Sequence, residues 1–184
     1  MKRTVLIFGL ISGVISSAMM FLTMSLLLRG VISFDNGEVI GYTAIFLSFL
    51  LVFFGVRSYR ENHGGTISFG RAFAVGILIT LVSCVFYVVS WEIIYFNNMM
   101  PDFIEKYSAH EIARARAKGA DQTAIAAKRK EMEEMKAALD NPLLNAAYTF
   151  MEPLPVGLVM TLVSAGILRK RGGGTPGRAT AAVA

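Results

Sequence analysis

Cysteine and histidine are nearly absent from this 184-residue sequence, which holds only Cys84, His63 and His110. A single cysteine excludes a disulfide within the chain and redox chemistry on paired thiols. The CxxC, HExxH, GxSxG and GxxxxGK motifs are all missing, and with them the common metal, nucleophile and phosphate sites. We therefore expect no metal centre, no cofactor and no enzymatic activity.

One nucleotide-binding pattern does occur, a GxGxxG match in GGGTPG at 172–177. This motif binds a dinucleotide only between a strand and a helix, whereas here it follows an apolar stretch. We interpret the match as chance. The Gly-rich segment 172–184 is typical of a disordered tail.

Charge is also scarce, at 17% of residues against about 25% in soluble domains. Hydrophobic residues make up 54%, and the charges are segregated. LIFGLISGVISSAMMFLTMSLLL contains none, while KYSAHEIARARAKGADQTAIAAKRKEMEEMK is rich in them. This composition predicts an all-α polytopic membrane protein with one polar insert, rather than a soluble domain with an apolar core.

Four stretches are apolar and long enough to cross a bilayer core of about 30 Å as helices. They cover residues 5–28, 39–56, 72–96 and 144–168. The alternative for the first is a cleaved signal peptide, since Lys2 and Arg3 precede it and the SSA at 16–18 is a weak cleavage pattern. Its apolar run is too long for a usual signal peptide, so we expect one membrane domain over residues 1–171.

Lysine and arginine indicate the orientation of these spans. The side that carries both termini has nine cations opposed only by Glu61: Lys2, Arg3, Arg57, Arg60, Arg71, Arg169, Lys170, Arg171 and Arg178. The insert 97–143 on the other side has eight basic and eight acidic residues. Both termini are therefore predicted to be cytoplasmic. The net charge of +5 reflects topology and contact with the lipid bilayer, and does not indicate nucleic-acid binding.

The insert 97–143 predicts a helical hairpin. Pro101 suits a first helical turn, Gly119 ends the first helix, and Asp121 caps the second helix, which stops before Asn141. The second helix has only a thin apolar stripe: Ile125, Met132, Met135 and Leu139. This thinness favours packing on the bundle or the membrane surface. The alternative is that the hairpin binds a partner membrane protein.

Small residues recur at every fourth position in three spans: Gly9, Gly13 and Ser17; Ala72, Gly76, Thr80 and Cys84; Gly157, Thr161 and Ala165. Such stripes let helix backbones approach closely inside a membrane. The same motif serves packing within one bundle and contact between two copies. We favour packing within the bundle, with a homo-oligomer as the alternative.

Two carboxylates lie inside the predicted spans, Glu92 in the third and Glu152 in the fourth. At about 1.5 Å per residue, they lie about 28 and 24 Å from the cytoplasmic ends of their spans. They therefore share one layer below the outer face, near Arg29 at the end of the first span. Pro153 and Pro155 each remove a helical hydrogen bond beside Glu152.

These five residues form a candidate intramembrane polar site, in which a carboxylate beside free carbonyls holds a proton or a small cation. The competing interpretation is structural. The fourth span would start at Pro153, Glu152 would lie in the interface, and Glu92 would reach headgroup water or pair with Arg29. We favour the structural interpretation.

Three segments together resemble a bacterial membrane family, domain of unknown function 4199. They are TISFGRAFAVGILITLVSCVFYVVSWEIIYFN, PDFIEKY and NPLLNAAYTFMEPLPVGLVMTLVSAGILRKR. The likeness covers nearly the whole chain up to Arg171. It implies a four-helix protein of the bacterial inner membrane, and it brings no activity or site residue with it.

We expect a non-enzymatic accessory or interaction component of a membrane assembly. The alternative is a small oligomeric transporter or channel subunit that uses Glu92 and Glu152. An enzyme with an active site formed by Glu152, Tyr95 and His110 ranks third. A polar cavity that reaches Glu152 from both faces would favour transport, and a tightly packed bundle would favour the accessory role.

Overall fold

The computed structural model describes residues 1–170, so the predicted tail at 172–184 lies outside the described part. Within it the chain forms helices α1 (Lys2–Leu28), α2 (Phe34–Glu61), α3 (Phe69–Phe96), α4 (Phe103–Ala117), α5 (Gln122–Leu139), α6 (Pro142–Met151) and α7 (Pro153–Leu168). Four segments are long and apolar enough to cross a membrane: α1, α2, α3, and α6 with α7. The predicted all-α polytopic membrane fold is confirmed.

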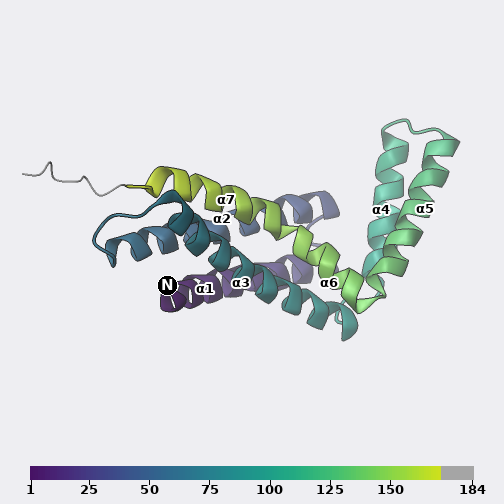
Figure 1. Ribbon diagram of the computed structural model, residues 1–184. Coiled ribbons are helices and arrows are strands. Elements are labelled where there is room, and N and C mark those ends of the chain that lie inside the picture. The colour runs from purple at the N-terminus through teal and green to yellow at the C-terminus, as the bar shows by residue number, and fades with distance from the viewer. Residues whose placement is uncertain (171–184) are drawn as a thin grey trace, which may run out of the picture.

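These four segments form a bundle, with the N-terminus at one end and the hairpin of α4 and α5 standing out from the other (Figure 1). We call these the terminal end and the hairpin end. α1 packs on α2 and α3, and α7 packs on the same two helices. α6 lies against α3 and α5 at the hairpin end.

Capping side chains set where the helices begin. The Ser33 hydroxyl accepts a hydrogen bond from the Asn36 amide at 3.3 Å, and the Ser68 hydroxyl accepts one from the Arg71 amide at 3.4 Å. Because these caps lie outside the apolar runs, α2 and α3 begin earlier than the predicted spans at 39 and 72. α2 also continues to Glu61, beyond the predicted end at 56.

The predicted helical hairpin is present. Gly119 has φ of +81°, which ends α4, and the Asp121 carboxylate caps α5 by accepting from the Ala124 amide at 2.7 Å. Pro101 does not occupy the first turn, because Asp102 adopts the left-handed conformation with φ of +60° and α4 begins at Phe103. The turn residues were therefore predicted correctly at the tip of the hairpin and not at its base.

The small-residue stripes pack inside the bundle. A Cβ added to Gly13 would lie 2.6 Å from the Cβ of Phe86, and one added to Gly9 would lie 2.8 Å from the Cβ of Val82, so α1 and α3 are in close contact. The Ser83 hydroxyl donates to the Gly9 carbonyl at 3.1 Å across the same interface. This geometry agrees with packing within one bundle, and a homo-oligomer stays a prediction.

α3 and α7 also pack closely through glycines and hydroxyl groups. A Cβ on Gly76 would lie 2.9 Å from the Thr161 methyl, and a Cβ on Gly157 would collide with the Thr80 methyl. The Thr80 hydroxyl lies 3.3 Å from the Gly157 carbonyl and 3.2 Å from the Thr161 hydroxyl. Two reciprocal glycine–threonine contacts therefore hold these helices together.

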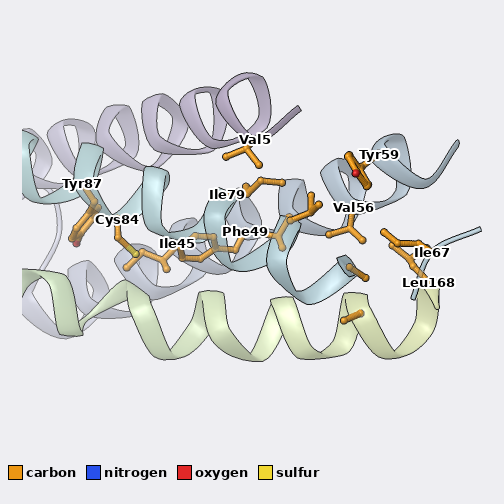
Figure 2. Packing of buried hydrophobic residues seen from close by; sticks show 14 of the residues in the cluster. Val5, Ile45, Phe49, Val56, Tyr59, Ile67, Ile79, Cys84, Tyr87 and Leu168 are labelled. Carbon is orange, nitrogen blue, oxygen red and sulfur yellow. The ribbon is translucent and has the colours of Figure 1, made fainter. Parts of the chain in front are cut away.

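The apolar core runs along the bundle axis, from Tyr87 and Cys84 near the hairpin end to Ile67 and Leu168 at the terminal end (Figure 2). The terminal half is closed. Six of its side chains expose no surface: Val52, Val56, Ala72, Val75, Ile79 and Ala165. An isolated β-bridge between Ile67 and Lys170, with N···O distances of 3.0 and 2.9 Å, joins the chain at the foot of α3 to the end of α7.

The α3–α7 contact gives a stability prediction. Gly157→Ala should lower the stability of the protein by about 1–3 kcal/mol, because the added methyl must displace Thr80 and break its hydrogen bonds. Gly166→Ala is the matched control in the same helix, since its added Cβ would meet nothing within 4 Å beyond its chain neighbours and the backbone of its own helix. It should be neutral or slightly stabilising. Thermal unfolding in a mild detergent measures both, and equal melting temperatures for the two variants would contradict this account of the interface.

Candidate functional site

A cavity of about 320 Å³ lies inside the hairpin end. The second half of α1 and the first half of α2 form one side of it, and the ends of α3 and α6 form another. Phe103 and Tyr107 of α4 and Leu139 of α5 complete the lining, so the hairpin is part of the wall. The residues that line the cavity therefore come from segments far apart in the sequence, from Ser16 to Glu152.

Two carboxylates line this cavity, Glu152 at the break between α6 and α7 and Glu38 in the second turn of α2. The Tyr87 hydroxyl donates a hydrogen bond to Glu152 Oε2 at 3.1 Å. No lysine, arginine or histidine is among the lining residues. Within residues 1–170 no basic nitrogen lies within 4.0 Å of Glu152, so its only side-chain partner there is a neutral phenol.

Aromatic side chains make up much of the remaining wall: Phe34, Tyr42, Tyr87, Trp91, Phe103, Tyr107 and Tyr148. The rings of Trp91 and Phe103 pack edge to face with centroids 5.7 Å apart. Trp91 and Tyr87 are one helical turn apart on α3, so both reach the cavity. The aromatic residues give the cavity an apolar body that carries a few hydroxyl groups.

Asn145 fixes the position of Trp91. Its side chain has no exposed surface, and its Oδ1 accepts a hydrogen bond from Trp91 Nε1 at 2.8 Å. Its Nδ2 donates to the Leu139 carbonyl at 2.9 Å, and the Thr149 hydroxyl lies 3.3 Å from Oδ1. One amide therefore joins α3, the end of α5 and α6, and it accepts the hydrogen bond of a partly buried indole N–H.

The hairpin is attached to the start of α2 through rings and ion pairs. The Phe34 ring packs against Phe103, Tyr107 and His110 with centroid distances of 5.9, 5.8 and 5.3 Å. Asp35 Oδ1 lies 3.6 Å from Arg114 Nη1 and 3.4 Å from His110 Nε2. The hairpin thus packs on its own bundle, as favoured, and binding of a partner protein through it stays a prediction.

Ion pairs also join the two helices of the hairpin. Lys128 Nζ lies 3.6 Å from Glu111 Oε2, and Lys136 pairs with Glu105. The hydrogen bond from Lys136 holds the pKa of the Glu105 carboxyl below its usual value. Burial raises the pKa of the Tyr107 phenol, so Tyr107 faces the cavity as a neutral hydroxyl at physiological pH.

The residues predicted to share a site are only partly brought together. Pro153 and Glu152 stand at the break, since α6 ends at Met151 and α7 begins at Pro153, while Pro155 is exposed. Glu92 does not line the cavity, and its Oε1 is buried without a hydrogen-bond partner within residues 1–170. Arg29 is exposed and forms no ion pair with a described residue. Neither Glu92 nor Arg29 therefore shares the cavity with Glu152.

The three residues considered for an enzyme have separate surroundings. The Tyr95 hydroxyl donates to Asp140 at 2.9 Å, His110 lies against Phe34 and Asp35, and Glu152 accepts from Tyr87. Within residues 1–170 no group of three histidine, cysteine or acidic side chains has the arrangement of a metal site.

Sequence reasoning missed Glu38 and Asn145. Glu38 falls just outside the predicted span 39–56, but the Ser33 cap extends α2 to include it. Glu38 and Tyr42 then stand one turn apart and both line the cavity. Asn145 carried a usable signal, because an amide inside an apolar span needs a hydrogen-bonding partner.

A bundle of four apolar segments with a cavity at one end defines a multi-pass membrane protein. The chain belongs to the family described as protein of unknown function DUF4199, whose model matches residues 7–170. The resemblance stated from the sequence is thereby confirmed. No curated protein and no solved structure matches the chain.

The role of Asn145 is testable through Trp91, the sole tryptophan of the chain. Asn145→Ala should lower stability by about 1–3 kcal/mol, because the indole N–H and the Leu139 carbonyl both lose their partner. It should also change the emission maximum of Trp91. Asn97→Ala, which removes only a bond to the Ile93 carbonyl at an exposed position, should change neither. A Trp91 spectrum that is identical in Asn145→Ala and the wild type would refute the assigned contact.

Proposed function

We propose that this protein is a non-enzymatic accessory component of a membrane assembly, and that it binds a small ligand in the cavity at the hairpin end. The observation that carries the proposal is the one-ended cavity. It reaches Glu152 among residues of the hairpin half, while the terminal half is filled by side chains with no exposed surface, such as Val52, Val75 and Ala165. A cavity confined to one half of the bundle can bind a ligand, but it offers no path across one copy of the chain.

The alternative is an oligomeric transporter or channel subunit. Glu92 favours it, because a buried carboxylate oxygen without a partner within residues 1–170 is costly unless water, an ion or another chain satisfies it. In that case the path would run between copies, along a face of α3 that does not line the cavity. The proton or cation would then bind at Glu92, with Glu152 facing the cavity instead.

We further propose that the hairpin end faces away from the cytoplasm of a bacterial inner membrane. Support comes from the seven cations of the described flanks at the terminal end, against an insert whose charges balance. They are Lys2, Arg3, Arg57, Arg60, Arg71, Arg169 and Lys170. The binding cavity would then receive its ligand from outside the cytoplasm or from the outer leaflet.

Single cysteines test this function and its orientation. In a Cys84→Ser background, Ala120→Cys in the hairpin turn and Ala44→Cys in the cavity wall should react with a charged, membrane-impermeant thiosulfonate added to intact cells. Ala165→Cys, which lies in the closed half with no exposed surface, should react from neither side. Mass spectrometry of the purified protein measures the modified fraction.

The remaining outcomes are distinct. Modification of Ala165→Cys in inverted vesicles would mean that the terminal half opens, which would overturn the one-ended site and favour transport. Modification of Ala120→Cys in inverted vesicles alone would reverse the proposed orientation. A failure of Ala44→Cys to react from either side, while Ala120→Cys reacts, would show that the cavity admits no ligand.

A further inference from the structure

The charges of the cavity restrict what it can bind. Its lining contains the carboxylates of Glu38 and Glu152 and no basic side chain. Glu38 is partly neutralised at the rim, since its Oε2 lies 3.8 Å from Arg114 Nη1. Glu152 has only the Tyr87 hydroxyl. An ionised carboxylate within a membrane segment usually requires a cation close by, and no basic side chain of residues 1–170 lies within 4.0 Å of Glu152.

The walls around Glu152 favour an organic cation over a metal ion. Hard metal ions bind through several oxygen ligands, yet Glu152 has a single side-chain hydrogen-bond partner, and the rest of the lining is largely aliphatic and aromatic. Aromatic faces attract ammonium groups through their quadrupole. The Tyr87 hydroxyl bonds to Glu152, and Trp91 lies one turn further along α3 in the wall of the same cavity. The carboxylate and the aromatic groups therefore line one space.

We propose that the ligand of this cavity is an organic ammonium ion with an apolar body. The ammonium group donates hydrogen bonds to Glu152, and the apolar body lies against Trp91 and Phe103. The volume of about 320 Å³ falls at the small end of ligand pockets, which span about 300–1,000 Å³. The inference rests on the ligand-binding function proposed in the preceding subsection, and it adds the chemical class of the ligand.

Trp91 makes the inference measurable, because the sole tryptophan of the chain lines the cavity. The full chain in nanodiscs of phosphatidylglycerol, which carries no ammonium group, is titrated with 2-phenylethylamine and with its uncharged counterpart 2-phenylethanol. Trp91 fluorescence reports occupancy in both titrations. We expect saturable binding of the amine, at least about tenfold tighter than that of the alcohol, because a charge-assisted pair adds to the same apolar contact.

Variants assign the effect to one side chain. Glu152→Gln keeps the shape and a hydrogen-bond acceptor for Tyr87, so it should weaken amine binding at least about tenfold while alcohol binding is unchanged. Unchanged alcohol binding also shows that the variant retains its cavity. Glu134→Gln, on the exposed face of α5 and outside the cavity, is the matched control and should bind both probes as the wild type does.

If the wild type binds the amine and the alcohol with equal affinity, the proposed ammonium class is wrong. The ligand-binding function proposed above is not contradicted by that result. An amine affinity that Glu152→Gln does not change would overturn the assigned residue and with it the proposal. If neither probe changes Trp91 fluorescence, the ammonium class is wrong. The modification of Ala44→Cys then decides separately whether the cavity is accessible at all.

The ammonium group has two sources, a free amine or the ethanolamine headgroup of a lipid, and both share the same chemistry. The titration is therefore repeated in nanodiscs that also contain phosphatidylethanolamine. If the headgroup occupies the cavity, the apparent affinity of the wild type for 2-phenylethylamine falls in these nanodiscs, and that of Glu152→Gln does not. If a free amine is the ligand, the affinity of the wild type is the same in both lipid mixtures.

Discussion

The contact between Thr80 and Gly157 is the constraint on which the arrangement of this molecule depends. Apolar side chains gain little by leaving lipid for one another, so helices in a bilayer are held by close backbone approach and by hydrogen bonds between them. Gly157 has no side chain at the crossing, and the Thr80 hydroxyl bonds to its carbonyl at 3.3 Å. Tyr87 follows Thr80 by two helical turns on the same face of α3. The crossing therefore also determines that Tyr87 meets Glu152.

The break at Pro153 divides the bundle into a closed half and an open half. α7 packs on both α2 and α3, whereas α6 packs on α3 and α5 and has no comparable packing on α2. An uninterrupted α7 would fill the space beside α2 with its side chains. Those side chains are absent here, and the cavity occupies this space. Phe103 and Tyr107 of α4 cover part of this gap, which gives the hairpin a role in the site although it lies outside the spans.

The sequence predicted what is local and missed what depends on helix rotation. Hydropathy and caps gave the four apolar segments, the Gly119 turn and the Asp121 cap, because each is decided within a few residues. The rotation of each helix about its axis was not predictable in this way. One residue turns a helix by about 100°, and Glu92 follows Trp91 onto a face that does not line the cavity. Glu38 and Asn145 were missed because their partners come from other helices.

Negative charge in the cavity is compensated unequally from the rim inward. At the rim, Arg114 of the hairpin lies close to both Asp35 and Glu38. The same arginine therefore attaches the hairpin to α2 and partly neutralises the Glu38 carboxylate. Further inside, Tyr87 offers Glu152 a single hydrogen bond and no charge. A phenol hydrogen bond stabilises a carboxylate less than a cation does, so an ionised Glu152 favours any state in which a cation enters the cavity. An ionised Glu152 therefore lacks the compensating charge that a bound cation would supply. Arg114 does not supply it, because Arg114 pairs with Asp35 and Glu38 and so holds the hairpin against α2.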